Sequence, residues 1–203
     1  NLAAFLNEAR ESDCYEFYYL VIATGMRRGE ILALEWNDVD FRAKTISVNK
    51  QLQRTPEGLH ISPPKTKSSI RKISISDECV SLLKVMRGKQ RLDQKLLFPS
   101  PITDGYRDPD AVTRKLLRML RRAGLPDIRF HDLRHSFATL SLEQGMDIKT
   151  VSHMLGHTDA GFTMNTYMHV TDAMQQNVAD TMSNLINEKE EEKRKSNIIK
   201  LNA

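Results

Sequence analysis

The chain has 203 residues, of which 40% are apolar and 28% charged, and its formal net charge is +4. This length predicts one domain with a packed core, and no run of about 18 apolar residues is present that would span a membrane. The two cysteines, Cys14 and Cys79, exclude a disulfide scaffold and a cysteine-rich zinc site. Together with the lack of a secretory signal they predict a cytoplasmic protein. Because the first residue is Asn1, we expect a piece of a longer protein.

Apolar residues at spacings of three and four predict a mainly helical chain. The expected helices lie at 2–6, 15–23, 30–35, 80–86, 111–123, 130–143, 148–155, 160–167 and from 172 to about 185. Ser76 is expected to cap the helix at 80–86, and Gly156 to end the helix at 148–155. The buried stripe of the helix at 130–143 is predicted to consist of Leu133, Phe137 and Leu140.

Alternation of apolar and polar residues predicts strands at 45–49 and 70–75, and Leu59 and Ile61 indicate a third strand between them. The predicted fold class is therefore mainly α with a small antiparallel β-sheet of about three strands (α+β). We expect one domain at 1–180 and a C-terminal tail at 181–203. The apolar stripe of the last helix predicts that this region docks on a neighbouring copy or on its own domain.

The charge is unevenly distributed along the chain. The segment from His60 to His135 carries 17 Lys and Arg against eight Asp and Glu, whereas the rest carries 13 against 18. A strongly basic segment in a near-neutral chain favours a polyanionic partner, although basic side chains also solvate ordinary helix faces.

The first motif with chemical potential is Thr-Gly-Met-Arg-Arg-Gly-Glu at 24–30. Arg27 and Glu30 would share a face if this turn is helical. The guanidinium of an arginine suits a phosphate, because it can donate two parallel N–H bonds. Glu30 could orient that guanidinium from behind. The alternative is a surface charge pair at a helix start.

The second motif is a lysine-rich turn that contains Lys65 and Lys67 between two apparent strands. We expect a hairpin tip here, exposed and able to reach into a groove of DNA. A lysine at the tip could contact DNA or donate a proton. An ordinary polar turn has the same composition.

The third motif is His-Asp-Leu-Arg-His at 131–135. Helical spacing places His131, Arg134 and His135 on one face, where they could bind an anion at a helix start. Two histidines four residues apart also occur in the H-E-x-x-H zinc helix. Here Asp132 replaces the glutamate of that motif and no clear third ligand follows, so no metal is expected.

The fourth motif is Leu155-Gly156-His157, followed by Tyr167. Gly156 can end a helix in the left-handed conformation, which leaves His157 at a turn. Taken singly, a histidine after a helix end and a tyrosine on a helix are usually structural.

The four motifs together resemble tyrosine recombinases, the phage-integrase family, because they occur in that family's order. The resemblance runs from about Tyr15 to Val170 and implies that family's catalytic-domain fold. The segment at 155–170 looks most like integrases of phages and conjugative transposons from Gram-positive bacteria. Complete members carry N-terminal core-binding and arm-binding domains, which we expect to be absent from this chain.

The resemblance gives the matching positions their roles. Arg27 and Arg134 match the arginines that bind the scissile phosphate, and Tyr167 matches the nucleophile. Lys65 best matches the β-hairpin lysine that acts as general acid, with Lys67 as the alternative.

Three further positions match as well. His131 matches the histidine of the H-x-x-R motif, His157 a position held by His or Trp, and Glu30 the acidic residue that supports the first arginine. Additional DNA contacts are expected from Arg28, Lys67 and His135.

The implied activity is that of a site-specific recombinase, acting through a 3′-phosphotyrosyl intermediate to integrate or excise a mobile element. The covalent link conserves the bond energy, so neither ATP nor a metal cofactor is expected. The implied partners are double-stranded attachment-site DNA, further copies in a synaptic tetramer and an accessory directionality factor, in the cytoplasm of a bacterial host. The alternatives are a DNA-binding module without catalysis, a chromosome-dimer resolvase of the same family and a zinc hydrolase.

Overall fold

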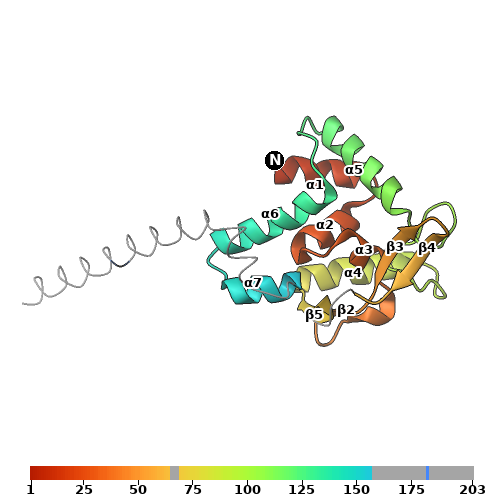
Figure 1. The fold of residues 1–203 in the computed structure, drawn as a ribbon, viewed down its shortest axis with the longest axis horizontal. Coiled ribbons are helices and arrows are strands. Elements are labelled where there is room, and N and C mark those ends of the chain that lie inside the picture. Colours follow the sequence, from red (N-terminus) through yellow and green to blue (C-terminus); the bar gives the residue numbers. More distant parts are fainter. Residues whose placement is uncertain (65–68, 157–181, 183–203) are drawn as a thin grey trace, which may run out of the picture.

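The computed structural model describes residues 1–64, 69–156 and 182. Its described helices are α1 (Leu2–Glu11), α2 (Tyr15–Thr24), α3 (Arg28–Leu32), the 3₁₀ helix η1 (Trp36–Asp38), α4 (Asp77–Lys89), α5 (Pro109–Arg122), α6 (Phe130–Glu143) and α7 (Ile148–Leu155). Figure 1 shows these helices grouped around α2, with the strands along one side. None of the described helices is long and apolar enough to cross a membrane.

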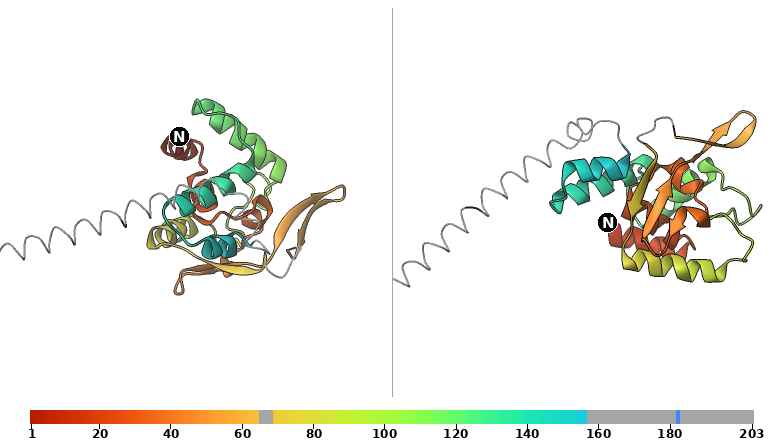
Figure 2. Two further views of the ribbon diagram at one scale, coloured as in Figure 1. Left: turned by 60° about the vertical axis from the view of Figure 1, so that its left-hand side comes forward. Right: turned by 90° about the horizontal axis from the view of Figure 1, so that it is seen from below.

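The strands form two sheets among the described residues rather than the single expected sheet. They are β1 (Val39–Asp40), β2 (Thr45–Val48), β3 (Gln51–Thr55), β4 (Gly58–Ser62) and β5 (Arg71–Ser74). One antiparallel sheet has the order β1-β2-β5, and β3 and β4 form a separate antiparallel hairpin. This hairpin projects from the body of the molecule in Figure 2. The predicted fold class is confirmed, but its strand count is wrong.

The strand pairing corrects the position of the hairpin tip. Val48 pairs with Arg71 in one sheet, and Gln51 pairs with Ser62 in the hairpin. The tip lies where Thr55 pairs with Gly58. The prediction of a hairpin tip at 65–69 is therefore wrong, because the strands before and after it belong to different sheets. Lys65 and Lys67 themselves lie outside the described residues.

Helix α2 forms the centre of the core because its side chains are apolar nearly all round. Phe17, Tyr18, Leu20 and Val21 are buried, and α2 contacts α1, α4 and α6. Its last residues continue into the first motif. The position of α2 therefore decides where that motif lies.

The C-terminal end of α2 packs closely on two later helices. Gly25 ends α2 with a φ of +61°, and a Cβ atom there would lie 2.5 Å from Phe137 and 2.9 Å from Leu155. Phe137 belongs to α6 and Leu155 to α7. The glycine thus allows the first, third and fourth motifs to meet.

Several local predictions are confirmed. Helix α6 has the predicted bounds, Ser76 caps α4 by accepting from the Cys79 amide at 3.2 Å, and Gly156 ends α7 with a φ of +66°. The predicted stripe is wrong at Leu140, which is 41% exposed. The helices expected at 160–167 and from 172, and the domain boundary at 180, lie outside the described residues apart from residue 182.

Candidate active site

Arg27 and Glu30 form the ion pair that their spacing predicts. Nη1 of Arg27 lies 2.9 Å from Oε1 of Glu30, and the Arg27 amide donates to Oε2 at 2.8 Å. The Glu30 side chain is 2% exposed, whereas that of Arg27 is 35% exposed. Glu30 therefore holds both the backbone and the side chain of Arg27 from the protein interior.

A second arginine keeps this buried carboxylate ionised. Burial alone would raise the pKa of Glu30, but hydrogen bonds and charge from Arg71, and then from Arg27, more than offset it. The pKa of Glu30 consequently lies below its ordinary value. The pair Arg27–Glu30 is thus charged on both sides at neutral pH.

Arg134 is buried on α6, with 3% of its surface exposed. Its Nη1 donates to the Gly25 carbonyl at 2.9 Å and its Nη2 to the Leu155 carbonyl at 2.6 Å. These two contacts join the C-terminal ends of α2 and α7 to α6. These contacts fix the direction of the side chain.

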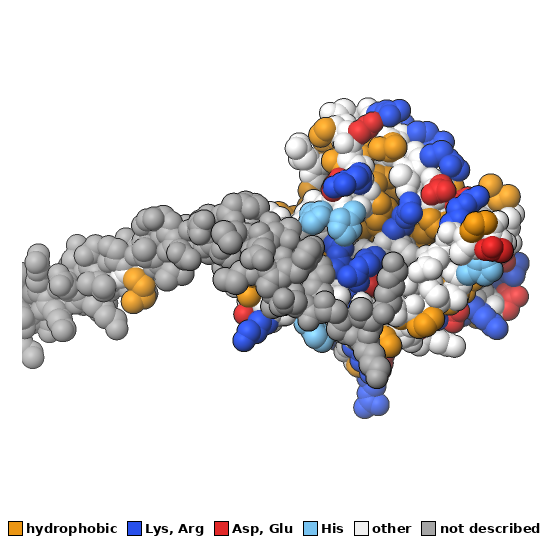
Figure 3. Space-filling model, in the orientation of Figure 1, with side chains coloured by type: hydrophobic (Ala, Val, Ile, Leu, Met, Phe, Trp, Pro, Cys, Tyr) orange, Lys and Arg blue, Asp and Glu red, His pale blue; other side chains and the backbone are white. Residues whose placement is uncertain are grey.

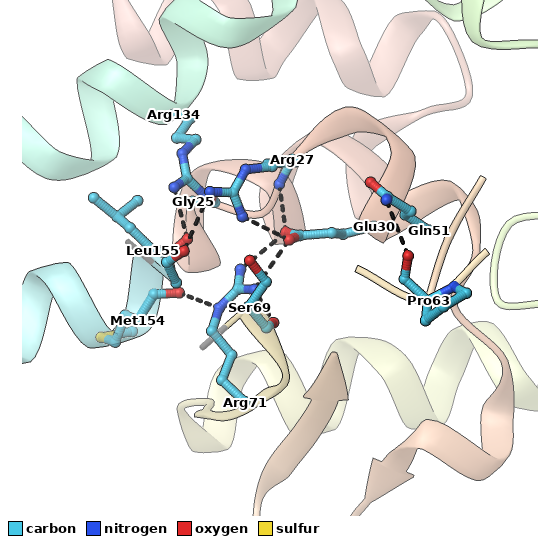
Figure 4. A network of polar contacts seen from close by, with 11 residues as sticks. Gly25, Arg27, Glu30, Gln51, Pro63, Ser69, Arg71, Arg134, Met154 and Leu155 are labelled. Carbon is cyan, nitrogen blue, oxygen red and sulfur yellow. Dashed lines mark hydrogen bonds and ion pairs between the residues drawn. The ribbon is translucent and has the colours of Figure 1, made fainter. Parts of the chain in front are cut away.

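Three arginines bind consecutive carbonyl oxygens at the end of α7. Arg71 Nε donates to the Met154 carbonyl at 2.6 Å, Arg134 to that of Leu155, and Arg27 Nη2 to that of Gly156 at 3.3 Å. The last carbonyls of a helix lack intrahelical partners and carry the negative end of its dipole. The end of α7 thus gathers three positive groups from three other elements, and Figure 4 shows this cluster.

The histidines of the third motif lie next to each other on α6. The rings of His131 and His135 meet edge to face, with centroids 4.6 Å apart. Loss of hydration lowers the pKa of His131, and the charges of His135 and Arg134 lower it further. His131 is therefore a neutral hydrogen-bonding group at neutral pH.

Asp132 caps the start of its own helix. Its Oδ2 accepts from the Arg129 amide at 2.8 Å, which caps the start of α6, and its Oδ1 pairs with Arg129 Nη2 at 2.9 Å. Within the described residues, no group of three or more His, Cys, Asp or Glu side chains is placed to hold a metal ion.

One cavity brings four predicted site residues together. It has a volume of about 560 Å³ and is lined by residues that include Arg27, Arg28, His131 and Arg134. These residues come from the start of α3 and from α6, which are far apart in the sequence. In Figure 3, Lys and Arg side chains follow the face that carries α5 beside this region. The cavity lining itself includes four arginines and two aspartates, Asp127 and Asp132, so it is basic on balance.

Arg28 is used within the protein, although the sequence predicts a DNA contact. Its Nη1 donates to the Pro109 carbonyl at 3.1 Å and to Oγ1 of Thr113 at 2.5 Å. These contacts fix the start of α5 to the start of α3. Its contact with DNA stays a prediction.

The sequence analysis missed Arg71. This residue shares the buried face of β5 with Ile73, and its side chain is fully buried. The sequence does contain a signal for Arg71, because its position alternates with those of Ile73 and Ile75 on one face of a predicted strand. A charged side chain on a buried face needs dedicated hydrogen-bond partners.

Four predicted residues lie outside the described part of the chain, namely Lys65, Lys67, His157 and Tyr167. Their neighbours are nevertheless described. Gly156 precedes His157 directly, and its carbonyl binds Arg27.

Comparison with known proteins gives a consistent result. The family model described as "Phage integrase family" matches residues 2–174. A XerC-like tyrosine recombinase of Caldanaerobacter subterraneus subsp. tengcongensis is 32% identical over 194 residues, covering 83% of this chain and 48% of that protein. The ICEBs1 integrase of Bacillus subtilis is 32% identical over 181 residues, covering 84% and 48%. The chain spans about half the length of these relatives.

Solved structures show the same fold. The Tn1549 transposon integrase, in complex with circular intermediate DNA, matches with a TM-score of 0.72 at 24% identity, covering 87% of this chain and 64% of that one. The XerA recombinase matches with a TM-score of 0.68 at 24% identity, covering 86% and 60%. With the family model matching nearly the whole described chain, the protein belongs to the phage integrase family.

Proposed function

We propose that this chain is the catalytic domain of a site-specific DNA recombinase that cuts and rejoins DNA through a 3′-phosphotyrosyl intermediate. The observation that carries the proposal is the convergence of Arg27, His131 and Arg134 on one cavity. Two fixed guanidinium groups and a neutral imidazole suit a phosphodiester whose nonbridging oxygens gain charge during attack.

The remaining residues supply the covalent chemistry. Tyr167 would attack phosphorus and form the 3′-phosphotyrosyl bond, while the 5′-oxygen departs. Lys65 would donate a proton to that oxygen as general acid. A 5′-hydroxyl of a second duplex then attacks the phosphotyrosine, which restores the phosphodiester and releases the tyrosine. His157 would contact a nonbridging oxygen from its place after Gly156.

The proposed partner is double-stranded DNA at an attachment site. The exposed side of α5 carries four arginines that would neutralise phosphates, namely Arg114, Arg118, Arg121 and Arg122. The Tn1549 integrase is a relative of this fold that is solved with DNA. We further propose a synaptic tetramer on DNA and an accessory directionality factor, as the family resemblance implies.

A nicked suicide duplex from the flanks of the encoding element tests the proposal. When such a duplex is cut, the short strand after the break diffuses away and the covalent protein–DNA adduct accumulates on a denaturing gel. Wild type should form this adduct, also in EDTA, because cationic side chains occupy the role of a metal. Loss of cleavage on chelation that zinc or magnesium restores would count against this mechanism and for a metal hydrolase.

Tyr167→Phe is the matched control, because it removes only the attacking oxygen. Its DNA affinity should stay within a few-fold of wild type while the adduct disappears. A wild-type protein that binds the duplex without forming adduct would instead be a DNA-binding module. Duplexes from a chromosomal dimer-resolution site, offered in parallel, would reveal a resolvase if only they are cut.

A further inference from the structure

Arg71 has more fixed partners than a residue that only fills the core requires. Its Nη1 and Nη2 donate to the two carboxylate oxygens of Glu30 at 3.0 and 2.9 Å. Its Nη1 also donates to the Ser69 carbonyl at 3.0 Å, and its Nε to the Met154 carbonyl at 2.6 Å. Figure 4 shows this guanidinium between α3, β5 and the end of α7.

The carboxylate of Glu30 accepts two hydrogen bonds from each of two arginines. Its Oε1 accepts from Nη1 of Arg27 and Nη1 of Arg71, and its Oε2 accepts from the Arg27 amide and Nη2 of Arg71. Arg71 is fully buried, whereas Arg27 is 35% exposed and lines the cavity. Arg71 therefore fixes the orientation of the Glu30 carboxylate from the protein interior. The carboxylate in turn fixes the guanidinium of Arg27, which lies nearer the surface.

The two carbonyl contacts fix Arg71 in turn. Ser69 lies two residues before Arg71, the first residue of β5, and Met154 lies in the last turn of α7. A guanidinium with bonds to a sheet and to a helix end cannot rotate without breaking several of them at once. Arg71 is thus a rigid reference point for the carboxylate.

We propose that Arg71 is a positioning residue of the active site, which fixes the guanidinium of Arg27 through the shared carboxylate of Glu30. The catalytic meaning of this role rests on the proposed function, in which Arg27 binds the scissile phosphate. The contrasting possibility is that Arg71 only stabilises the fold.

The test compares Arg71→Met with Arg71→Lys and with Arg107→Met in the full chain. Arg107 is a suitable control, because its half-buried guanidinium donates to the Pro99 carbonyl at 2.8 Å and does not line the cavity. The readouts are the rate of adduct formation at saturating protein, the DNA affinity and the pH profile between 5 and 8. Thermal unfolding of each variant identifies a general loss of structure.

We expect Arg71→Met to slow adduct formation about 100-fold, as a displacement of about 1 Å in a catalytic group does. Its DNA affinity should stay within a few-fold, because the other phosphate contacts remain. Arg107→Met should lower stability without changing the rate at temperatures where the variant is folded. Equal effects of Arg71→Met and Arg107→Met on rate would overturn the proposal.

The pH profile separates positioning from stability. Within the described part of the chain, the charged groups that act on Glu30 are Arg27, at the start of its own helix, and Arg71, from β5. Without Arg71, burial would raise the pKa of Glu30, so protonation at mildly acid pH should release Arg27 and slow adduct formation. As the pH falls, Arg71→Met should therefore lose more of its activity than wild type does. The double variant Arg71→Met/Glu30→Gln should be slow but lack this additional acid loss.

Arg71→Lys keeps a positive charge beside Glu30 but cannot reach both oxygens and both carbonyls. It should restore the wild-type pH profile and only part of the rate. If neither substitution changes the pH profile, Arg71 acts on stability alone and the proposal is wrong.

A readout without catalysis keeps this inference distinct from the proposed function. The side-chain NMR signals of Arg27, assigned with an Arg27→Lys variant, report how freely its guanidinium rotates. Arg71→Met should make this rotation faster, and Arg107→Met should leave it unchanged. A wild-type protein that forms no adduct would overturn the proposed function, while unchanged Arg27 signals in Arg71→Met would overturn the positioning role.

Discussion

A Cβ atom on Gly156 would lie 2.9 Å from Nη1 of Arg71. Gly156 also has a φ of +66°, so an alanine here meets both backbone strain and a fixed guanidinium. Gly124 has nearly the same φ, +67°, but nothing lies within 4 Å of its Cβ position. We expect Gly124→Ala to lower the free energy of unfolding by about 1 kcal/mol. Gly156→Ala should cost about 1–3 kcal/mol more, because of the added overpacking.

Urea denaturation of both variants measures this difference, since the backbone strain cancels between them. Equal losses would mean that Arg71 moves aside without cost. In that case the end of α7 would hold its arginines less firmly than the distances indicate.

Arg134→Ala should damage the fold as well as the chemistry. It leaves the Gly25 and Leu155 carbonyls without this donor in the protein interior, and one unsatisfied buried group costs about 1–3 kcal/mol. We expect a loss of roughly 3 kcal/mol in the free energy of unfolding. Arg134→Lys should recover part of that loss and still form no adduct, because lysine lacks the two parallel donors.

Unfolding curves and adduct assays on the same preparations separate the two effects. Robust adduct formation by Arg134→Lys would show that a point charge suffices at this position. The proposed two-bond grip on the phosphate would then be abandoned.

The pKa of His131 tests how strongly burial and the neighbouring His135 act on this side chain. It lies below its ordinary value because of lost hydration first and the charge of His135 second. NMR titration should therefore give a midpoint below 6.5 for His131, and His135→Gln should raise it. The folded protein binds fewer protons here than the unfolded chain, so His131 lowers stability as the pH falls through the ordinary histidine range. A midpoint that does not move in His135→Gln would remove this neighbour as a cause.

Lys65→Ala tests the general acid through the leaving group. It should slow cleavage of ordinary DNA by roughly 10²–10⁴-fold, the usual contribution of a positioned proton donor. A substrate with a 5′-bridging sulfur leaves as a thiolate that needs no proton, so the variant should cleave it at nearly the wild-type rate. Arg134→Lys should not recover, because its proposed task concerns the nonbridging oxygens.

Lys67→Ala is the paired control on the same two substrates. Recovery with Lys67→Ala instead of Lys65→Ala would assign the acid to Lys67. Recovery with neither would leave both lysines as DNA contacts and transfer the proton to another group, such as His131 or His157.

The helices were predictable because their signals are local. Helix α6 shows the 3.6-residue period over its full length, and Gly156 ends α7 by a conformation that glycine adopts readily. Leu140 was misplaced because periodicity identifies an apolar face but not how far a neighbouring element covers it. The ion pair Arg27–Glu30 was predictable for the same local reason, a separation of three residues on a helix.

The hairpin and Arg71 were not predictable from spacing. Strands β3 and β4 are exposed over most of their surface, and Leu52 is their one buried residue, so apolar alternation is weak there. The segment at 65–69, which follows Pro63 and Pro64, is consequently predicted as the turn. Arg71 and Glu30 are separated by 41 positions, and only the fold shows that they meet. The meeting of Arg27 and Arg134 was available from the family resemblance and from no local pattern.

Val48 pairs with Arg71 in one sheet, and Gln51 pairs with Ser62 in the other. The length of the connection between the two sheets is therefore independent of the register within each sheet. Each sheet has its own residue pairs, so residues can be added or removed between Pro63 and Ser69 without changing the register of either sheet. Lengthening such a connection is inexpensive, since each doubling costs only about 0.6 kcal/mol in closure entropy. Insertions and deletions here can therefore leave Arg71 and its contacts with Ser69, Glu30 and Met154 in place. The length of this segment can therefore be changed by a protein engineer without disturbing the buried arginine cluster.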